Sequence, residues 1–362
     1  MHFAFSDQQT EFRDAVRQVL AKECTTDDLR AAFEHPAART PRWEVLVGLG
    51  VVGLSVPEAE GGLGLGLVDL VLLLEEAGRV SLPEPLLETA GLAVPLLAGL
   101  VRSPGSDIAA VVDPWLDAIA EGRATAAVGA MTDPPAPIAG ADGADLLVLW
   151  TAGADGPELH VVDAAVVTVR SVSSLDPTRR LGIPHWSPTA ETRVLAGADA
   201  DSAWRATRDR AALLTAALLL GLTERMISTA AAYAKERQQF GKPIGSFQAV
   251  KHLLAGAQVH LEFARPVVYG AAWSLDGSGP EASSPTAVSR AASTAKAYAS
   301  DAATEAARVS LQIHGAIGYT WECDLHLFLK RAWALAEAWG SSDDHRALVL
   351  ESLVQDAAAP GD

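Results

Sequence analysis

Apolar residues recur at helical spacing near the start of the chain and predict that it opens with an amphipathic helix. Val16, Val19 and Leu20 fall on one face of this helix, and charged residues fall on the other. Ser6 followed by Gln9 is a capping box, in which the serine accepts a helical N–H and the glutamine reaches back to the cap. We expect the helix to begin there and to pack sideways.

Two further helical segments are predicted in the first eighty residues. They cover 43–49 and 68–78, and Gly78 is interpreted as a left-handed stop. A glycine-rich stretch at 56–66, VPEAEGGLGLG, separates them and predicts a loop.

The pattern changes at about Ala124, where short β-branched runs are interrupted by Asp, Gly and Pro. These runs are AAVGAM, DLLVLW, LHVVDAAVVTV and the stretch 192–195. They predict a small β domain that ends near Ala200.

Long helical periodicity returns after Ala203, over 205–236, 247–276, 286–313 and 325–339, with SLDGSGPEASSP as a loop. The order of elements therefore predicts a mainly α protein with a small β domain (α+β). The expected domains are an N-terminal helical domain at 1–122, a shortened middle β domain at 123–202 and a C-terminal four-helix bundle at 203–362.

Charge and composition exclude several classes of protein. A formal net charge of −17 disfavours binding to nucleic acid, because phosphate backbones are repelled. Cys24 and Cys323 form no disulfide framework or metal motif, and we interpret both as buried structural thiols. The histidines form no HxxxH or HExxH pair, so no metal site is predicted.

No targeting or membrane segment is predicted. The first residues have neither a basic region nor an apolar core of the signal-peptide type. The longest apolar run, 211–222, is shorter than a bilayer span and predicts a buried core helix. We therefore expect a cytoplasmic protein without a membrane anchor.

Motifs for other enzyme classes are weak or absent. GLGVVG at 48–53 has the spacing of a dinucleotide-binding turn, but no strand precedes it and no helix is predicted to follow it. A Rossmann oxidoreductase is accordingly disfavoured. No GxSxG motif or nucleophilic cysteine pattern indicates covalent catalysis.

Two turns carry candidate binding residues. Arg237 ends a long predicted helix and Phe240 follows in a turn, so that a guanidinium and a ring could hold a pyrophosphate and a planar cofactor. A helix-capping arginine with a core phenylalanine explains these residues equally well. Gln312 precedes a second turn, Gly315 to Gly318, and could bind an adenine or ribose edge, or the segment could simply join two helices.

Several segments together resemble the acyl-CoA dehydrogenase family. They are FSDQQTEFRDAVRQVL, WEVLVGLGVVGLSVPEAEGGLGL, LLLEEAGRVSLPEPLLETA, RQQFGKPIGSFQAVKH and QIHGAIGYTWECDLHLFLKRA. The resemblance implies a tetrameric flavoprotein of fatty acid or sterol degradation that holds FAD between subunits. It also implies oxidation of an acyl-CoA thioester to the 2-enoyl-CoA, with an electron-transfer-flavoprotein-type acceptor.

The resemblance also implies two groups of cofactor-binding residues. Those expected to reach the FAD of a neighbouring subunit are Arg237, Gln239, Phe240, Ile244 and Phe247, and those of the adenine-side turn are Gln312, Gly315 and Ala316. Ala316 stands where the family usually has glycine, and its methyl group fits only if the backbone there keeps a negative φ.

The catalytic base that the resemblance implies has no counterpart at the expected positions. One family position falls at Trp339, or Gly340 with a shift of one, and the other falls at Ala211; none of these residues accepts a proton. Carboxylates lie near these positions in the sequence, and each is equally well explained as a solvated charge at a helix end. They are Asp209, Glu337, Asp343 and Asp344. The catalytic residue is therefore unassigned.

The middle domain departs from the family as well. Thr132 to Pro134 resemble a flavin-covering turn, but the segment from Pro134 to Asp145 has no room for the W-x-T strand that covers the rest of the ring. This suggests the non-catalytic-type partner of a heterotetrameric enzyme similar to actinobacterial ones that act on sterol side-chain thioesters. The alternative is a helical scaffold, or an acyl-CoA-binding partner, without redox activity.

Overall fold

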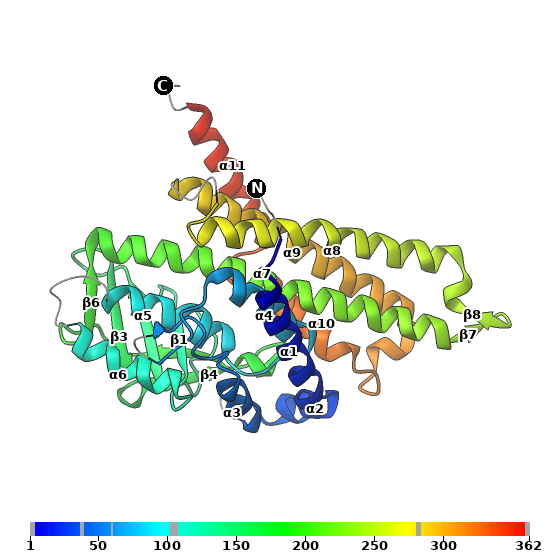
Figure 1. The fold of residues 1–362 in the computed structure, drawn as a ribbon, viewed down its shortest axis with the longest axis horizontal. Helices are drawn as coiled ribbons and strands as arrows, with labels where there is room; N and C mark the ends of the chain where they lie inside the picture. The colour runs from blue at the N-terminus through cyan, green and yellow to red at the C-terminus, as the bar shows by residue number, and fades with distance from the viewer. Residues whose placement is uncertain (1–3, 37–39, 59–60, 102–107, 280–283, 359–362) are drawn as a thin grey trace. The chain divides into compact units, whose positions relative to one another are not determined.

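The computed structural model describes residues 4–36, 40–58, 61–101, 108–279 and 284–358, and they form two compact units. One unit comprises Met1–Leu29, Leu67–Leu82 and Ala212–Asp362, and the other comprises Arg30–Gly66 and Pro83–Ala211. Most elements are helices, and one small sheet lies in the second unit (Figure 1). The predicted fold class, mainly α with a small β domain, is confirmed.

The first unit is helical. Its elements are α1 (Asp7–Glu23), α4 (Leu67–Arg79), the second part of α7 (Gly197–Glu236), α8 (Gln248–Leu275), α9 (Pro285–His314), α10 (Leu325–Glu337) and α11 (Ser342–Ala358). α9 packs against α8, α10 and α11, and α4 packs against α1 and α8. The capping box predicted for α1 is present, because the Ser6 side chain accepts from the Gln9 N–H and the Gln9 side chain accepts from the Ser6 N–H.

Two glycines allow α4 and α7 to cross at very short range. A Cβ atom on Gly221 would lie 1.9 Å from the carbonyl oxygen of Glu75, and one on Gly78 would lie 2.1 Å from that of Leu218. The interpretation of Gly78 as a left-handed stop is wrong, since α4 continues to Arg79 and Gly78 is absent from the residues with positive φ. Its lack of a side chain serves helix packing.

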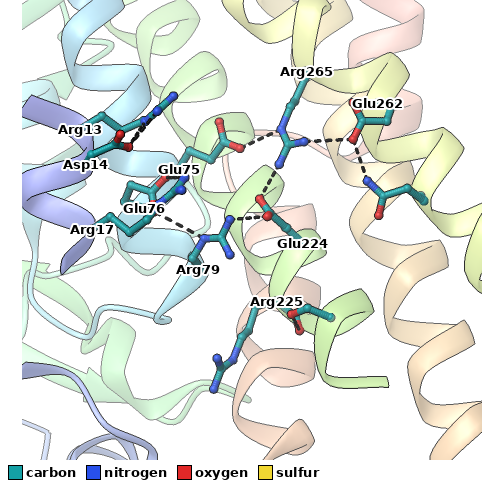
Figure 2. Close-up of polar contacts among 12 residues, drawn as sticks. Arg13, Asp14, Arg17, Glu75, Glu76, Arg79, Glu224, Arg225, Glu262 and Arg265 are labelled. Carbon is teal, nitrogen blue, oxygen red and sulfur yellow. Dashed lines mark hydrogen bonds and ion pairs between the residues drawn. The ribbon is translucent and has the colours of Figure 1, made fainter. Parts of the chain in front are cut away.

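A partly buried network of ion pairs connects α4, α7 and α8 (Figure 2). Arg265 of α8 donates to Glu75 at 2.9 Å and also contacts Glu224 of α7, and the Tyr269 hydroxyl donates to the second oxygen of Glu75. Burial raises the pKa of Glu75, and the hydrogen bonds from Arg265 and Tyr269 act in the opposite direction by stabilising the ionised carboxylate.

The same network extends to α1 through Glu76. Arg17 makes a two-pronged contact with this carboxylate, at 2.6 and 2.8 Å, and Arg79 bridges it to Glu224 (Figure 2). Alternating positive and negative side chains therefore fix α1, α4, α7 and α8 relative to one another.

The second unit carries the sheet. Its helices include α3 (Pro41–Gly48), the π-helix η2 (Leu87–Ala93), α5 (Val94–Val101) and α6 (Ala109–Ala120), and α2 (Thr26–Glu34) begins in the first unit. Its strands are β1 (Ala126–Met131), β2 (Leu146–Thr151), β3 (Glu158–Asp163), β4 (Thr168–Val172), β5 (Leu181–His185) and β6 (Arg193–Ala196).

The main sheet has the order β1-β2-β3-β6, with β1 and β2 parallel and the other pairs antiparallel. β4 and β5 form a separate antiparallel pair. Leu147, Leu149 and Val162 form the core of this unit together with Ala127 and Ile138. Ile138 also bridges to Gly182, so the short segment after β1 is pinned to β5.

The apolar run at 211–222 lies inside α7, as predicted, and its residues are buried. By length and composition α7 is apolar enough to cross a membrane, but 83% of its most apolar window is buried inside the protein, as in the core helix of a globular fold.

Cys24 is buried and Cys323 is only half-buried, so the prediction of two buried thiols holds for the first alone. No cluster of metal-binding side chains occurs among the described residues.

Candidate functional site

The corner between α7 and α8 is a small hairpin whose backbone is fixed by hydrogen bonds. β7 (Gln238–Gln239) pairs with β8 (Lys242–Pro243), followed by a 3₁₀ turn, η5 (Ile244–Ser246). The Arg237 N–H donates to the Tyr233 carbonyl at 2.9 Å, and the Arg237 carbonyl accepts from the Ile244 N–H at 2.8 Å. Its backbone is therefore held while its side chain is exposed to solvent.

Phe240 occupies the tip of this hairpin in a left-handed conformation, with φ of 53°, and Gly241 follows at 76°. Two successive positive φ values define the tight turn that matches the twist of a two-stranded ribbon, in which Asn or Gly is preferred. A bulky L-residue there costs about 1–2 kcal/mol. The ring is nevertheless 92% exposed, so the protein gains almost no burial in return. The alternative of a core phenylalanine is wrong for this residue.

The other residues of the corner form its base. Phe247 is half-buried and meets the ring of Phe240 edge-on at a centroid distance of 6.1 Å, while the Lys242 ammonium lies 4.5 Å from the centre of the Phe247 ring. Ile244 is also half-buried, and Gln239 is exposed. The corner thus combines cationic, amide and aromatic groups on one exposed hairpin.

The second predicted turn begins where α9 ends. Gly315 has a φ of 62° and caps the helix, and the 3₁₀ helix η6 (Gly315–Tyr319) follows. Gln312, Gly315 and Ala316 are exposed. Ala316 is not among the residues with positive φ, so its methyl group fits in the way the sequence requires.

A stacked pair of rings joins the two turns. Tyr233, one turn before the end of α7, stacks on His314 with centroids 4.5 Å apart and planes inclined by 19°. His314 is fixed in turn, because its Nδ1–H donates to the Ser310 carbonyl at 2.8 Å. The structure therefore brings the group around Arg237 and the group around Gln312 to the same end of the helical unit.

The carboxylates considered as displaced bases have structural partners or lie at helix ends. Ser341 caps α11, and Asp344 in the first turn of this helix accepts from the Ser341 N–H at 2.9 Å and from the Ser341 hydroxyl at 2.7 Å; these bonds lower the pKa of Asp344. Asp343 pairs with Arg346 at 3.1 Å, and Glu337 is the exposed last residue of α10. Asp209 is half-buried within α7.

Trp339, at one expected base position, lies in a strained and firmly held turn between α10 and α11. Its φ is 61°, in the left-handed region. The fully buried ammonium of Lys296 donates to the carbonyls of Ala336 at 2.8 Å and Gly340 at 2.9 Å, and the His345 Nε2 contacts the Trp339 carbonyl at 3.1 Å. Sequence reasoning missed Lys296, since an isolated lysine in a helical pattern carries no sign of burial.

Comparisons with known proteins identify the family. Residues 6–107 match the family model "Acyl-CoA dehydrogenase, N-terminal domain", and residues 204–354 match "Acyl-CoA dehydrogenase, C-terminal domain". The acyl-CoA dehydrogenase IpdE2 of Mycolicibacterium smegmatis is 34% identical over 337 residues, which cover 92% of this chain and 95% of that protein. The chain belongs to the acyl-CoA dehydrogenase family. The predicted family is thereby confirmed.

Solved structures of acyl-CoA dehydrogenases share the fold over nearly the whole chain. A variant of the Tcur3481-Tcur3483 steroid acyl-CoA dehydrogenase superposes with a TM-score of 0.81 at 25% identity, covering 98% of this chain and 99% of that one. The ChsE4-ChsE5 complex of Mycobacterium tuberculosis gives a TM-score of 0.81 at 24% identity and covers 100% of both chains.

FAD, the predicted cofactor, is the cofactor of this family, and proteins of the same fold include PigA, described as an FAD complex. The exposed residues fit the ADP half of this molecule. An arginine, two amides and a phenyl ring face solvent, and open space surrounds the position that a Cβ of Gly315 would take. Such groups suit a diphosphate, a ribose or adenine edge, and a planar ring.

Proposed function

We propose that this chain is a subunit of an FAD-dependent acyl-CoA dehydrogenase that converts an acyl-CoA thioester to its 2-enoyl-CoA together with a catalytic partner. The observation that carries the proposal is the exposed corner, where Phe240 sits in a strained conformation with its ring in solvent and the Arg237 side chain, three residues earlier, is also exposed. Local strain of this kind persists where function requires it. A flavin held by another subunit would cover both groups.

Each residue of the site has a role in this proposal. Arg237 binds the diphosphate of the partner's FAD, Phe240 packs on its planar part, and Gln312 accepts or donates at the adenine end. Gln239, Ile244 and Phe247 shape the corner, and Gly315 and Ala316 let the backbone approach the cofactor. FAD, when bound, would supply the two-electron oxidation as the hydride acceptor for the acyl Cβ–H bond, and the proton at Cα would pass to a base.

We assign the base to the partner. The positions expected to hold it carry Trp339 and Ala211, and the pKa of the nearby Asp344 is lowered by its capping bonds, which makes it a poor proton acceptor. The short segment between Thr132 and Asp145, pinned at Ile138, leaves no strand of the W-x-T type to cover a flavin in this chain. This chain therefore positions a cofactor for chemistry that another subunit completes.

Similar proteins support a paired enzyme and a bulky substrate. The ChsE4-ChsE5 structure is a complex of two differently named chains, and the Tcur3481-Tcur3483 protein is described as a steroid acyl-CoA dehydrogenase. We accordingly propose a sterol-type thioester as substrate, an electron-transfer-flavoprotein-type acceptor, a tetrameric assembly and a cytoplasmic location. The proposed domains remain 1–122, 123–202 and 203–362.

The visible spectrum of the chain, purified alone and after co-expression with its catalytic partner, tests the proposal. The chain alone is expected to be colourless and inactive, and the complex is expected to be yellow and to bleach when acyl-CoA is added. A chain that purifies alone with one FAD per subunit and full activity would overturn the paired role. A colourless complex that still binds acyl-CoA would favour the non-redox scaffold.

A further inference from the structure

Beneath the exposed residues of the two turns, a pair of rings connects α7 with α9. Tyr233 of α7 and His314 of α9 stack with their ring centroids 4.5 Å apart and their planes inclined by 19°. His314 is buried, with 6% of its surface exposed, and Tyr233 is half-buried. A stack of this kind is favourable beyond the area that it buries. The proposed function gives these two rings no role.

At the α7 end of the stack, Tyr233 is linked directly to Arg237. The Tyr233 carbonyl accepts from the Arg237 N–H at 2.9 Å, and the Arg237 carbonyl accepts from the Ile244 N–H at 2.8 Å. A Cβ atom on Gly245 would lie 2.9 Å from the Ala234 carbonyl oxygen, so η5 packs closely against the last turn of α7. A shift of Tyr233 therefore moves the backbone of Arg237, and the hairpin moves with it.

At the α9 end of the stack, His314 directly precedes the second turn. Its Nδ1–H donates to the Ser310 carbonyl at 2.8 Å, which fixes the orientation of the ring. The Gly315 N–H donates to the Leu311 carbonyl, so the first residue of the turn is held by α9. A Cβ atom on Gly318 would lie 3.0 Å from the His314 Cβ, so η6 packs directly on this residue. The ring of His314 and the second turn therefore move together.

Another contact between α7 and α9 lies two helical turns away from the stack. The Ser310 hydroxyl donates to the Met226 carbonyl at 3.0 Å, and Met226 precedes Tyr233 by seven residues in α7. This hydrogen bond holds the two helices together at that level. The ring stack instead fixes their separation near their ends, where both turns begin.

The separation between the turns matters because FAD is one covalent molecule. In the proposed function Arg237 binds the diphosphate and Gln312 binds the adenine end, and a ribose joins these parts of the ligand. Two groups contribute fully to binding one ligand only when their separation is fixed before the ligand arrives. If the separation were not fixed, FAD would have to order both turns on binding, which weakens its affinity.

We propose that Tyr233 and His314 are positioning residues whose stack sets the separation between Arg237 and Gln312, and thereby the affinity for the ADP half of FAD. Neither ring has to touch the cofactor. The inference rests on the proposed function, because it assumes that one FAD spans both turns.

Flavin release from the co-expressed complex on dilution tests the inference. Tyr233→Leu removes the ring and keeps an apolar side chain, and it is expected to raise the dissociation constant of FAD about three- to tenfold, as for the loss of one ring stack. His314→Leu breaks the stack from the other helix and is expected to have a similar effect. Tyr233→Phe keeps the ring and is expected to retain the wild-type affinity.

Ser310→Ala is the matched control. It removes the bond to Met226 but leaves the ring stack and the Ser310 carbonyl in place. The melting temperature is expected to fall in this variant, because a buried hydrogen bond is lost, while flavin release stays at the wild-type level. Circular dichroism checks that every variant is folded.

A double-mutant cycle separates positioning from general destabilisation. If the stack acts by placing Arg237, then Arg237→Ala weakens FAD binding less in the Tyr233→Leu variant than in the wild type, and the two effects are less than additive. A stack that only stabilised the fold would leave the two effects additive.

Three results would each overturn the inference. They are unchanged flavin release in folded Tyr233→Leu and His314→Leu variants, additive effects of Tyr233→Leu and Arg237→Ala, and equally raised flavin release in Ser310→Ala. Release that rises in Arg237→Ala but not in Tyr233→Leu rejects the positioning role alone. Release that is unchanged in Arg237→Ala rejects the proposed cofactor site, and the positioning role with it.

Discussion

At the scale of single residues, Phe240 destabilises the folded chain locally, because a strained backbone holds an exposed ring. Its left-handed backbone costs about 1–2 kcal/mol, and its exposed ring recovers almost none of this in the isolated chain. Replacing Phe240 is therefore expected to change the free energy of unfolding and flavin binding in opposite directions.

Phe240→Gly is expected to raise the free energy of unfolding by up to about 1 kcal/mol, because relief of the left-handed strain exceeds the extra entropy of glycine. Flavin retention in the assembled enzyme is expected to fall. Urea denaturation and flavin absorbance measure the two effects. In the control, Gly241→Ala introduces strain at a φ of 76° and is expected to destabilise the hairpin. A loss of stability in Phe240→Gly would contradict this account.

Arg237→Ala is expected to weaken flavin retention about ten- to hundredfold, since a charge-assisted bond to a diphosphate contributes about 1.5–3 kcal/mol. Flavin released from the complex during dilution measures the effect. Arg308→Ala is a matched control, because Arg308 is an exposed arginine of α9 that pairs with Glu305. Equal flavin occupancy in both variants would remove Arg237 from the site.

Sequence reasoning reached the exposed residues of the site but not the buried ones that hold it. Arg237 and Phe240 stood out because a cation and an aromatic residue precede a glycine at the end of a helix. The pairing of Tyr233 with His314 joins segments about eighty residues apart, and neither residue has a distinctive local pattern. Lys296 was not predicted either, because two of its three acceptors, the carbonyls at and just after the end of α10, are about forty residues away in the sequence.

At the scale of elements, the crossing of α4 and α7 depends on the absence of two side chains. Gly221→Ala places a methyl group 1.9 Å from the Glu75 carbonyl and is expected to lower the free energy of unfolding by about 3 kcal/mol. Thermal denaturation measures it. Gly99→Ala in α5, where a Cβ meets nothing within 4 Å, is expected to stabilise the chain by about 0.5–1 kcal/mol. Similar effects of the two changes would contradict close packing at the crossing.

In the sheet, the buried His160 links β3 to the turn before β6. Its Nδ1 lies 3.1 Å from the Thr192 hydroxyl and its Nε2 lies 3.2 Å from the Glu158 carboxylate. Burial lowers the pKa of His160 below its ordinary value of 6.5, while bonding to Arg193 lowers that of Glu158 below 4.5. The two groups therefore affect stability in different pH ranges.

The free energy of unfolding is expected to decline as pH falls below about 6.5. His160 has a lower pKa in the folded chain than in the unfolded chain, so the unfolded chain binds a proton there first. The contribution of Glu158 is lost only below about pH 4.5. Denaturation between these pH values should show a smaller slope in His160→Gln than in wild type. The exposed His185→Gln serves as a control, and an unchanged slope in His160→Gln would contradict the prediction.

Elements with irregular patterns were not predicted. β5 contains Gly182 and Pro184, which are unusual in strands, but it forms only one side of a two-stranded pair. α5 and α6 contain Pro95 and Pro114, which are unfavourable inside helices, and no helix was predicted for either segment. α11 buries His345 and Ser352 rather than an apolar stripe, so its helical periodicity was hidden. The long helices α7, α8 and α9 were predicted to within a few residues, apart from the start of α7.

At the scale of the whole molecule, the net charge of −17 opposes association of two copies. Raising the salt concentration from 0.01 to 0.1 M shortens the screening length from about 30 to about 10 Å. Repulsion between acidic chains is then screened, so the dissociation constant of the proposed assembly is expected to fall. Analytical ultracentrifugation measures this. Dissociation on adding salt would indicate that attraction between charges dominates.

The burial of Lys296 also determines how its amine reacts with acylating compounds. It is fully buried and bonded to Ser300, Ala336 and Gly340, whereas Lys22, Lys242 and Lys251 are open to solvent. Reactive thioesters acylate accessible amines, and this protein is proposed to work among such thioesters. Acylation of Lys296 would therefore require the turn between α10 and α11 to open first, and the resulting amide, with a single N–H, could not restore the three hydrogen bonds that the ammonium donates.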